Sequence, residues 1–283
     1  MRTTGVLDPR YVVARAVLLD ALEALGGQRE AVVVVGAQAI YLHTGNIELA
    51  VPEFTIDADI TIDPALLLES PEIESAMRAA RFERGNRVGA WIVQREIDGI
   101  PVNVEVDLMV PEAVGGGGRR AARLPGHAKE VARKARGLEA ALVDKTMRTI
   151  SALDPGDGRS SVVAVAGPTA LLIAKLHKIA ERVSERERHR LDDKDALDVL
   201  RLLQATDTSL LAATVARLLA VDVARDITRE ALAVLRNRFT DPRAAGPQMA
   251  ARAVGVLVPA NEVAASCATL ASDLVRAIFE AES

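Results

Sequence analysis

The segment FTIDADITI, residues 54–62, alternates apolar and polar side chains without interruption. Successive side chains of a β-strand point to opposite faces, so residues 54–63 are predicted to form a half-buried strand. Asp57 and Asp59 then lie on its polar face, two residues apart. Two neighbouring carboxylates repel each other, which favours a bound divalent cation or a raised pKa for one of them. An ordinary solvated strand face is the alternative interpretation of the same pattern.

A β-hairpin is predicted further along the chain. Residues 90–97 and 100–110 have strand patterns and flank an Asp-Gly dipeptide, which favours two-residue turns. Glu105 and Asp107 lie on one face of the second strand, opposite its valines. A carboxylate from either residue would complete a site for one or two metal ions. Magnesium suits such a site because it prefers oxygen ligands from a few carboxylates together with substrate phosphates.

A run of four valines, residues 32–35, ends at Gly36. This pattern predicts a buried strand, a tight turn and a short helix behind it. Such a turn directs the backbone N–H groups of Gly36 and Ala37 towards a phosphate, although many glycines at strand ends serve only as turns. The long gap before the acidic strand predicts a loop, residues 46–53, over the site.

A basic stripe is predicted on a long helix that begins at Pro168. Lys175, Lys178 and Arg182 recur at helical spacing beside an apolar stripe. A basic stripe next to a core face can point into a cleft and hold a triphosphate. The alternative is a solvated helix edge that has no ligand.

The order of these patterns predicts a mixed α/β (α+β) fold. Residues 1–165 combine strand patterns with predicted helices at 9–25 and 64–81, whereas residues 166–283 are almost entirely helical and rich in Ala and Leu. We therefore predict a catalytic domain over residues 1–165 and a helical domain over residues 166–283.

Composition restricts the possible functions. Aromatic residues make up only 2% of the 283 residues, which argues against binding single-stranded nucleic acid by stacking. The net charge is −4, so any RNA contact must come from a local patch. Residues 119–148 supply one candidate, with nine Lys or Arg against three Asp or Glu.

The cellular setting is predicted from the cysteine content and the apolar runs. The single Cys267 excludes an intrachain disulfide and a cysteine zinc site, and is typical of a reducing cytoplasm. The first residues lack the apolar region of a signal peptide, and no apolar run reaches the length of about 18 residues that a membrane span needs.

In combination, the motifs resemble those of the nucleotidyltransferase superfamily. That superfamily is marked by a Gly-Gly or Gly-Ser turn followed by an Asp-x-Asp or Asp-x-Glu strand, and VVVVGAQAIYLHTG (residues 32–45) and FTIDADITI occupy these places. The later segment KLHKIAERVSERERHRLDDKDALDVLRLL (residues 175–203) is similar to the helical signature of AbiE-type abortive-infection toxins and the related MenT-like mycobacterial toxins. The matching residues are Lys175, Leu176, Lys178 and Arg182, then Lys194, Asp195 and Asp198.

The resemblance implies a magnesium-dependent enzyme that moves a nucleoside monophosphate from an NTP to the 3′ end of tRNA. It implies a cytoplasmic toxin with a cognate antitoxin. Asp57 and Asp59 would hold Mg²⁺ on the triphosphate, and Asp107 would bind a second metal ion or act as the base. Lys175 would neutralise the phosphates as pyrophosphate leaves. The nucleotide-binding residues that it implies are Gly36, Ala37, Lys175, Lys178, Arg182 and Asp195.

One departure from the family pattern leaves other functions open. The superfamily has Ser or Gly where this chain has Ala37, so a hydroxyl contact to phosphate is lost and we expect weakened or reshaped NTP binding. A non-catalytic nucleotide-binding module would also explain Ala37. Transfer to a small molecule or a protein side chain is a further alternative, which the acidic net charge favours.

Overall fold

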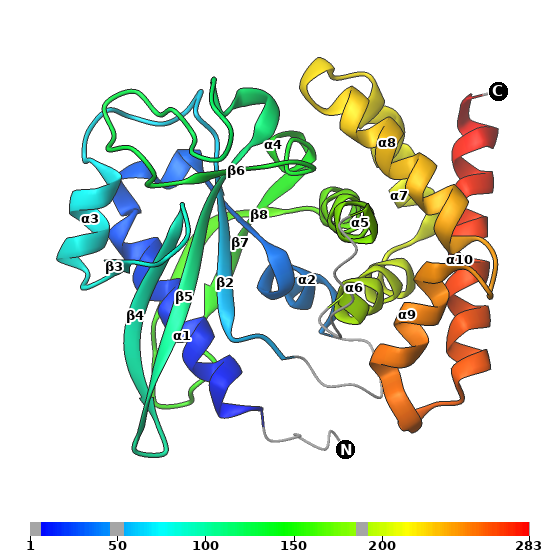
Figure 1. Cartoon of the computed structure of the whole chain (residues 1–283), viewed down its shortest axis with the longest axis horizontal. Helices are drawn as coiled ribbons and strands as arrows, with labels where there is room; N and C mark the ends of the chain where they lie inside the picture. The colour runs from blue at the N-terminus through cyan, green and yellow to red at the C-terminus, as the bar shows by residue number, and fades with distance from the viewer. Residues whose placement is uncertain (1–6, 46–53, 185–191, 283) are drawn as a thin grey trace. The chain divides into compact units, whose positions relative to one another are not determined.

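The computed structural model describes residues 7–45, 54–184 and 192–282. The chain divides into two compact units, which we call the sheet unit and the helical unit. The sheet unit comprises residues 1–39, 53–135 and 146–165, and the helical unit comprises residues 40–52, 136–145 and 166–283. Figure 1 shows the elements of both. The predicted division of function at residue 165 stays a prediction.

One mixed sheet of eight strands organises the described part of the sheet unit. Its central pairs are parallel between β2 and β5 and between β1 and β8, whereas β1 and β2 are antiparallel. The strands lie in the order β3 (Glu83–Arg84), β4 (Ala90–Ile97), β5 (Ile100–Pro111), β2 (Asp57–Ile62), β1 (Val32–Val35), β8 (Ser160–Ala166) and β7 (Lys145–Ser151), and β6 (Arg133–Ala135) pairs with β5. The predicted mixed fold class is therefore confirmed.

Local sequence explains the two best-defined parts of this sheet. All four valines of β1 are buried, as their uninterrupted apolar run predicts. Asp98 and Gly99 have φ values of +53° and +79°, which the predicted two-residue turn between β4 and β5 requires. Helix α1 (Pro9–Ala24) begins at Pro9 after Asp8, whose side chain accepts from the Arg10 backbone N–H, and it lies against β2, β4 and β5 (Figure 1).

The helix predicted over residues 64–81 is wrong in extent. Only α3 (Ile73–Ala79) forms, after a turn in which Asp63 accepts from the Ala65 backbone N–H. Pro71 explains the interruption, because proline disfavours helical backbone at the residue before it and supplies no N–H of its own. The strand predicted over residues 54–63 also begins later, at Asp57, and Ile56 is exposed rather than in the core.

The helical unit is built from six main helices in its described residues. They are α5 (Pro168–Ser184), α6 (Asp192–Ala205), α7 (Thr208–Leu219), α8 (Asp222–Phe239), α9 (Ala245–Val254) and α10 (Ala260–Glu282). Helix α5 packs against α6 and α8, and α10 packs against α7, α8 and α9. The short α4 (Ala140–Val143) contacts α5 and α8, and α2 (Gly36–Thr44) has residues in both units. The predicted helical region is confirmed.

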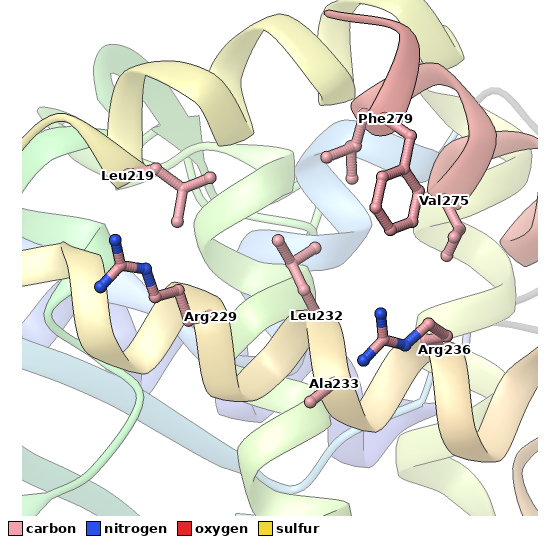
Figure 2. Close-up of a pocket in the computed structure, with 8 residues that line it drawn as sticks. Leu219, Arg229, Leu232, Ala233, Arg236, Val275 and Phe279 are labelled. Carbon is pink, nitrogen blue, oxygen red and sulfur yellow. The ribbon is translucent and has the colours of Figure 1, made fainter. Parts of the chain in front are cut away.

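A cavity of about 350 Å³ lies between α7, α8 and α10. Figure 2 shows its apolar side chains together with Arg229 and Arg236 of α8. None of the predicted site residues lines this cavity. Across the described ranges, no helix combines the length and the apolar character needed to cross a membrane.

Candidate functional site

The register of β2 and β5 places four carboxylates side by side. The strands are parallel, with Asp57 opposite Glu105 and Asp59 opposite Asp107. Opposed residues of neighbouring strands share a face and lie about 5 Å apart, so the four side chains form a two-by-two group, which we call the carboxylate array. The structure thus brings the predicted Asp57, Asp59 and Asp107 together, and their roles stay predictions.

Gly36 lies beside this array, at the end of the neighbouring strand β1. Strand β1 pairs with β2 so that Val35 lies opposite Asp59, and the chain turns immediately afterwards at Gly36, whose φ is +71°. A Cβ atom at Gly36 would lie 1.9 Å from Oδ2 of Asp59. Only glycine therefore fits here, because any side chain would both strain the backbone and displace the carboxylate.

The start of α2 is fixed to the array by a buried amide. Gln38 donates from Nε2 to the backbone oxygens of Asp57, at 3.0 Å, and Ala14, at 3.1 Å. Arg15 in turn donates from Nε to Oε1 of Gln38, at 2.8 Å. Gln38 and Arg15 are both buried, so this network ties α1, α2 and β2 together below the turn that carries Gly36 and Ala37. The sequence patterns gave no signal for it.

Two arginines flank the array, and sequence reasoning missed both. Arg133 of β6 donates from Nη2 to Oδ2 of Asp107, at 3.2 Å. Arg87, in the loop between β3 and β4, pairs with Glu105, and its Nη2 lies 3.7 Å from Oδ1 of Asp107. The available signal was electrostatic rather than periodic, because clustered carboxylates require nearby positive charge.

The carboxylates of the array differ in their burial and in their hydrogen-bond partners. Asp107 is 9% exposed, and its Oδ1 accepts no hydrogen bond from any described residue. Asp57 is exposed and accepts from the Thr55 hydroxyl. Burial acts to lower the pKa of Arg87, but the carboxylates of Asp107, Glu105 and Asp59 outweigh it and raise this pKa above its ordinary value.

Two adjacent carboxylates of the array could hold a magnesium ion that phosphate oxygens also bind. Within the described ranges, no three His, Cys, Asp or Glu side chains are close enough to hold a metal ion by themselves. Magnesium is commonly held by one or two carboxylates plus phosphate oxygens, so a full protein cage is not needed. Asp59 and Asp107 supply adjacent carboxylates, and Oδ1 of Asp107 is a buried acceptor that lacks a hydrogen bond.

In the helical unit, Lys175 of α5 forms a buried ion cluster with two aspartates of α6. Its Nζ lies 2.7 Å from Oδ1 of Asp195 and 2.7 Å from Oδ2 of Asp198. The three side chains are 9%, 4% and 1% exposed. Burial acts to lower the pKa of Lys175, but Asp198 and Asp195 together outweigh it, so the pKa is raised and the ammonium stays charged.

The other predicted nucleotide-binding residues have different surroundings. Lys178 has a half-exposed side chain, with Nζ 3.5 Å from Oδ1 of Asp195. Ala37 is buried at the beginning of α2. The side chain of Arg182 lies outside the described residues, as does the predicted loop at 46–53.

A known family matches most of the chain. A family model described as nucleotidyltransferase matches residues 14–220. A search of curated proteins and a search of solved structures each found no match. The matched range includes the carboxylate array, the Gly36 turn and the Lys175 cluster.

Proposed function

Because the chain belongs to the nucleotidyltransferase family, we propose that it moves a nucleoside monophosphate from an NTP to the 3′ end of tRNA. Family membership supports nucleotidyl transfer in general. The acceptor, the metal ion and the residue roles are our proposal. The observation that carries it is the pairing of Asp59 with Asp107 across β2 and β5, next to the Gly36 turn.

In this proposal the carboxylates have different catalytic roles. Asp57 and Asp59 would bind Mg²⁺, which neutralises charge on the triphosphate. Asp107 would accept the proton of the attacking hydroxyl or bind a second ion, and its buried Oδ1 is the oxygen that is open for either role. The hydroxyl oxygen bonds to the α-phosphorus, the bond to the β-phosphate breaks, and pyrophosphate leaves.

Positive groups would hold the phosphates. Backbone N–H groups of Gly36 and Ala37 start a helix, where they have no partners within the helix, and they can donate to phosphate oxygens. We also propose phosphate contacts for Lys175, Lys178 and Arg182 of the helical unit, as the resemblance implies. Lys175 has three N–H donors, of which one donates to Asp195, and its ammonium also forms an ion pair with Asp198. Asp195 would therefore act by fixing the direction of the ammonium.

An arginine-rich loop supports an RNA acceptor. Arg119, Arg120 and Arg123 have exposed side chains, and none forms an ion pair with a residue that the structure describes. Two other basic residues of the 119–148 segment are paired with carboxylates, Arg133 with Asp107 and Arg136 with Glu230. The loop is therefore the part of this segment that we propose for contact with the tRNA backbone.

The biological role that we propose follows the resemblance to AbiE-type and MenT-like toxins. Addition of nucleotides to the tRNA 3′ end would block charging, and a cognate antitoxin would restrain the enzyme. Expression of the protein alone should arrest growth, whereas the Asp59→Asn variant should not.

The acceptor is tested by following the label from α-³²P-NTPs. Wild-type protein with Mg²⁺ and total tRNA should yield labelled RNA, and Asp59→Asn should yield none above background. The acidic net charge of −4 favours a second candidate, transfer to a small molecule or a protein. Label found on small acceptors or on protein, with unlabelled tRNA, would replace the first proposal by the second.

A further inference from the structure

Arg87 lies where a cation would be needed to balance the carboxylate array. Its guanidinium pairs with Glu105 and lies 3.7 Å from Oδ1 of Asp107, the oxygen that accepts no hydrogen bond from the described residues. Asp107 already receives one positive charge, from Arg133 on its other oxygen. Arg87 therefore faces the atom that we propose for metal binding.

Metal binding at the array would place a second cation beside this guanidinium. Two cations that share the same carboxylates repel each other. Either one arginine side chain moves away from the carboxylates, or metal binding is weakened. Arg87 is the more mobile candidate, because its side chain is 62% exposed and extends from a loop bounded by Gly85 and Gly89. Arg133 is 32% exposed, and its backbone is paired with Met109 in the sheet.

We propose that Arg87 neutralises the carboxylate array in the absence of nucleotide and transfers to the triphosphate when the metal–nucleotide complex binds. This inference rests on the proposed function and adds Arg87 to the nucleotide-binding residues. A guanidinium suits both partners, since its planar set of N–H donors matches carboxylate and phosphate oxygens alike. The proposal predicts effects of opposite sign on metal binding and on nucleotide binding.

Isothermal titration of the full chain with two probes tests this proposal. The first probe is Mn²⁺ alone, and the second is each α,β-methylene NTP analogue with Mg²⁺. Arg87→Gln should bind Mn²⁺ at least about threefold more tightly, because a competing cation is gone. The same variant should bind the preferred analogue about tenfold more weakly, because a charged hydrogen bond to phosphate is lost.

Arg78→Gln is the matched control. Arg78 of α3 is also an exposed arginine paired with a glutamate, with Nη2 2.9 Å from Oε1 of Glu74, and this variant should change neither affinity. Unchanged affinities in Arg87→Gln, or two changes in the same direction, would overturn the inference while leaving the proposed function intact. If wild-type protein binds none of the analogues, the proposed function fails and the inference fails with it.

Discussion

At Gly36 the backbone of the sheet unit lies too close to a predicted catalytic carboxylate to leave room for a Cβ atom. The φ of +71° at Gly36 costs a side-chain-bearing residue about 1–2 kcal/mol, and a Cβ atom would lie 1.9 Å from Oδ2 of Asp59. We expect Gly36→Ala to lower the free energy of unfolding by more than about 2 kcal/mol, because strain and collision add. Urea denaturation measures this loss.

Gly99→Ala separates these two costs. Gly99 also has a positive φ, of +79°, but a Cβ atom there would meet nothing within 4 Å. This variant should lose only the backbone contribution, about 1–2 kcal/mol. Equal losses for the two variants would show that Gly36 is not packed against Asp59.

At the residue scale, sequence reasoning located the acidic residues but not their counter-charges. The strict alternation of residues 54–62 predicted that Asp57 and Asp59 share one face of their strand. The turn signal at Asp98 predicted where the next strand begins and therefore which of its faces carries Asp107. Arg87 could not be placed, because it lies in a loop between glycines, where no periodicity indicates direction. The buried Gln38 was missed for a similar reason, since its partners are backbone oxygens far away in sequence.

Helices α5 and α6 are joined by the Lys175 cluster, whose removal should be costly. Lys175→Met would leave Asp195 and Asp198 buried with less compensation, and breaking a buried ion pair typically costs about 3–5 kcal/mol. We expect the urea midpoint to fall accordingly. Lys178→Met is the control, because Lys178 is half exposed and the loss of a surface ion pair costs at most about 1 kcal/mol.

The pH dependence of this effect follows from the raised pKa of Lys175. A lysine with a raised folded-state pKa stabilises the fold fully below its unfolded value, near 10.4, and loses that contribution only as pH rises through the higher folded value. The stabilisation that Lys175 contributes should therefore be undiminished in the wild type up to about pH 9, so the stability difference from Lys175→Met should not shrink between about pH 6 and 9. A difference that shrinks within this range would contradict the cluster.

At the element scale, the sequence predicted correctly those helices and strands that have a single strong pattern. The valine run, the Asp-Gly hairpin and the helix that begins at Pro168 were all confirmed, because burial and turn chemistry point the same way. The helix predicted over residues 64–81 from the start signal at Asp63 and Pro64 is wrong in extent, because Pro71 interrupts it. Strand β7 was not predicted, because four of its seven side chains are exposed, only one is buried, and its alternation is weak.

Considered as a whole, the molecule has a net charge of −4, so RNA binding would depend on a small basic surface. We expect replacement of Arg119, Arg120 and Arg123 by Gln to weaken tRNA binding. Each lost phosphate contact reduces the magnitude of the slope of log affinity against log salt by about 0.7–0.9, so loss of three contacts should reduce it by about 2–3. Filter binding at several salt concentrations measures this slope.

The corresponding control changes arginines elsewhere. The control is the double variant Arg78→Gln and Arg95→Gln. It removes the exposed charge of Arg78, which pairs with Glu74, and the half-exposed charge of Arg95, which pairs with Asp20. This control should leave the salt slope of tRNA binding unchanged. A similar reduction in both variants would mean that overall charge, rather than the loop, determines RNA affinity.

Magnesium-dependent NTP binding tests the central claim, that carboxylates from β2 and β5 form a metal–nucleotide site. Calorimetric titration of wild-type protein with NTP should show binding that requires Mg²⁺. Asp59→Asn and Asp107→Asn should each weaken it at least about tenfold, since each removes a charged ligand. Asp98→Asn, the same change in the exposed hairpin turn, should have no effect. Undiminished Mg²⁺-dependent binding in both site variants would contradict the account.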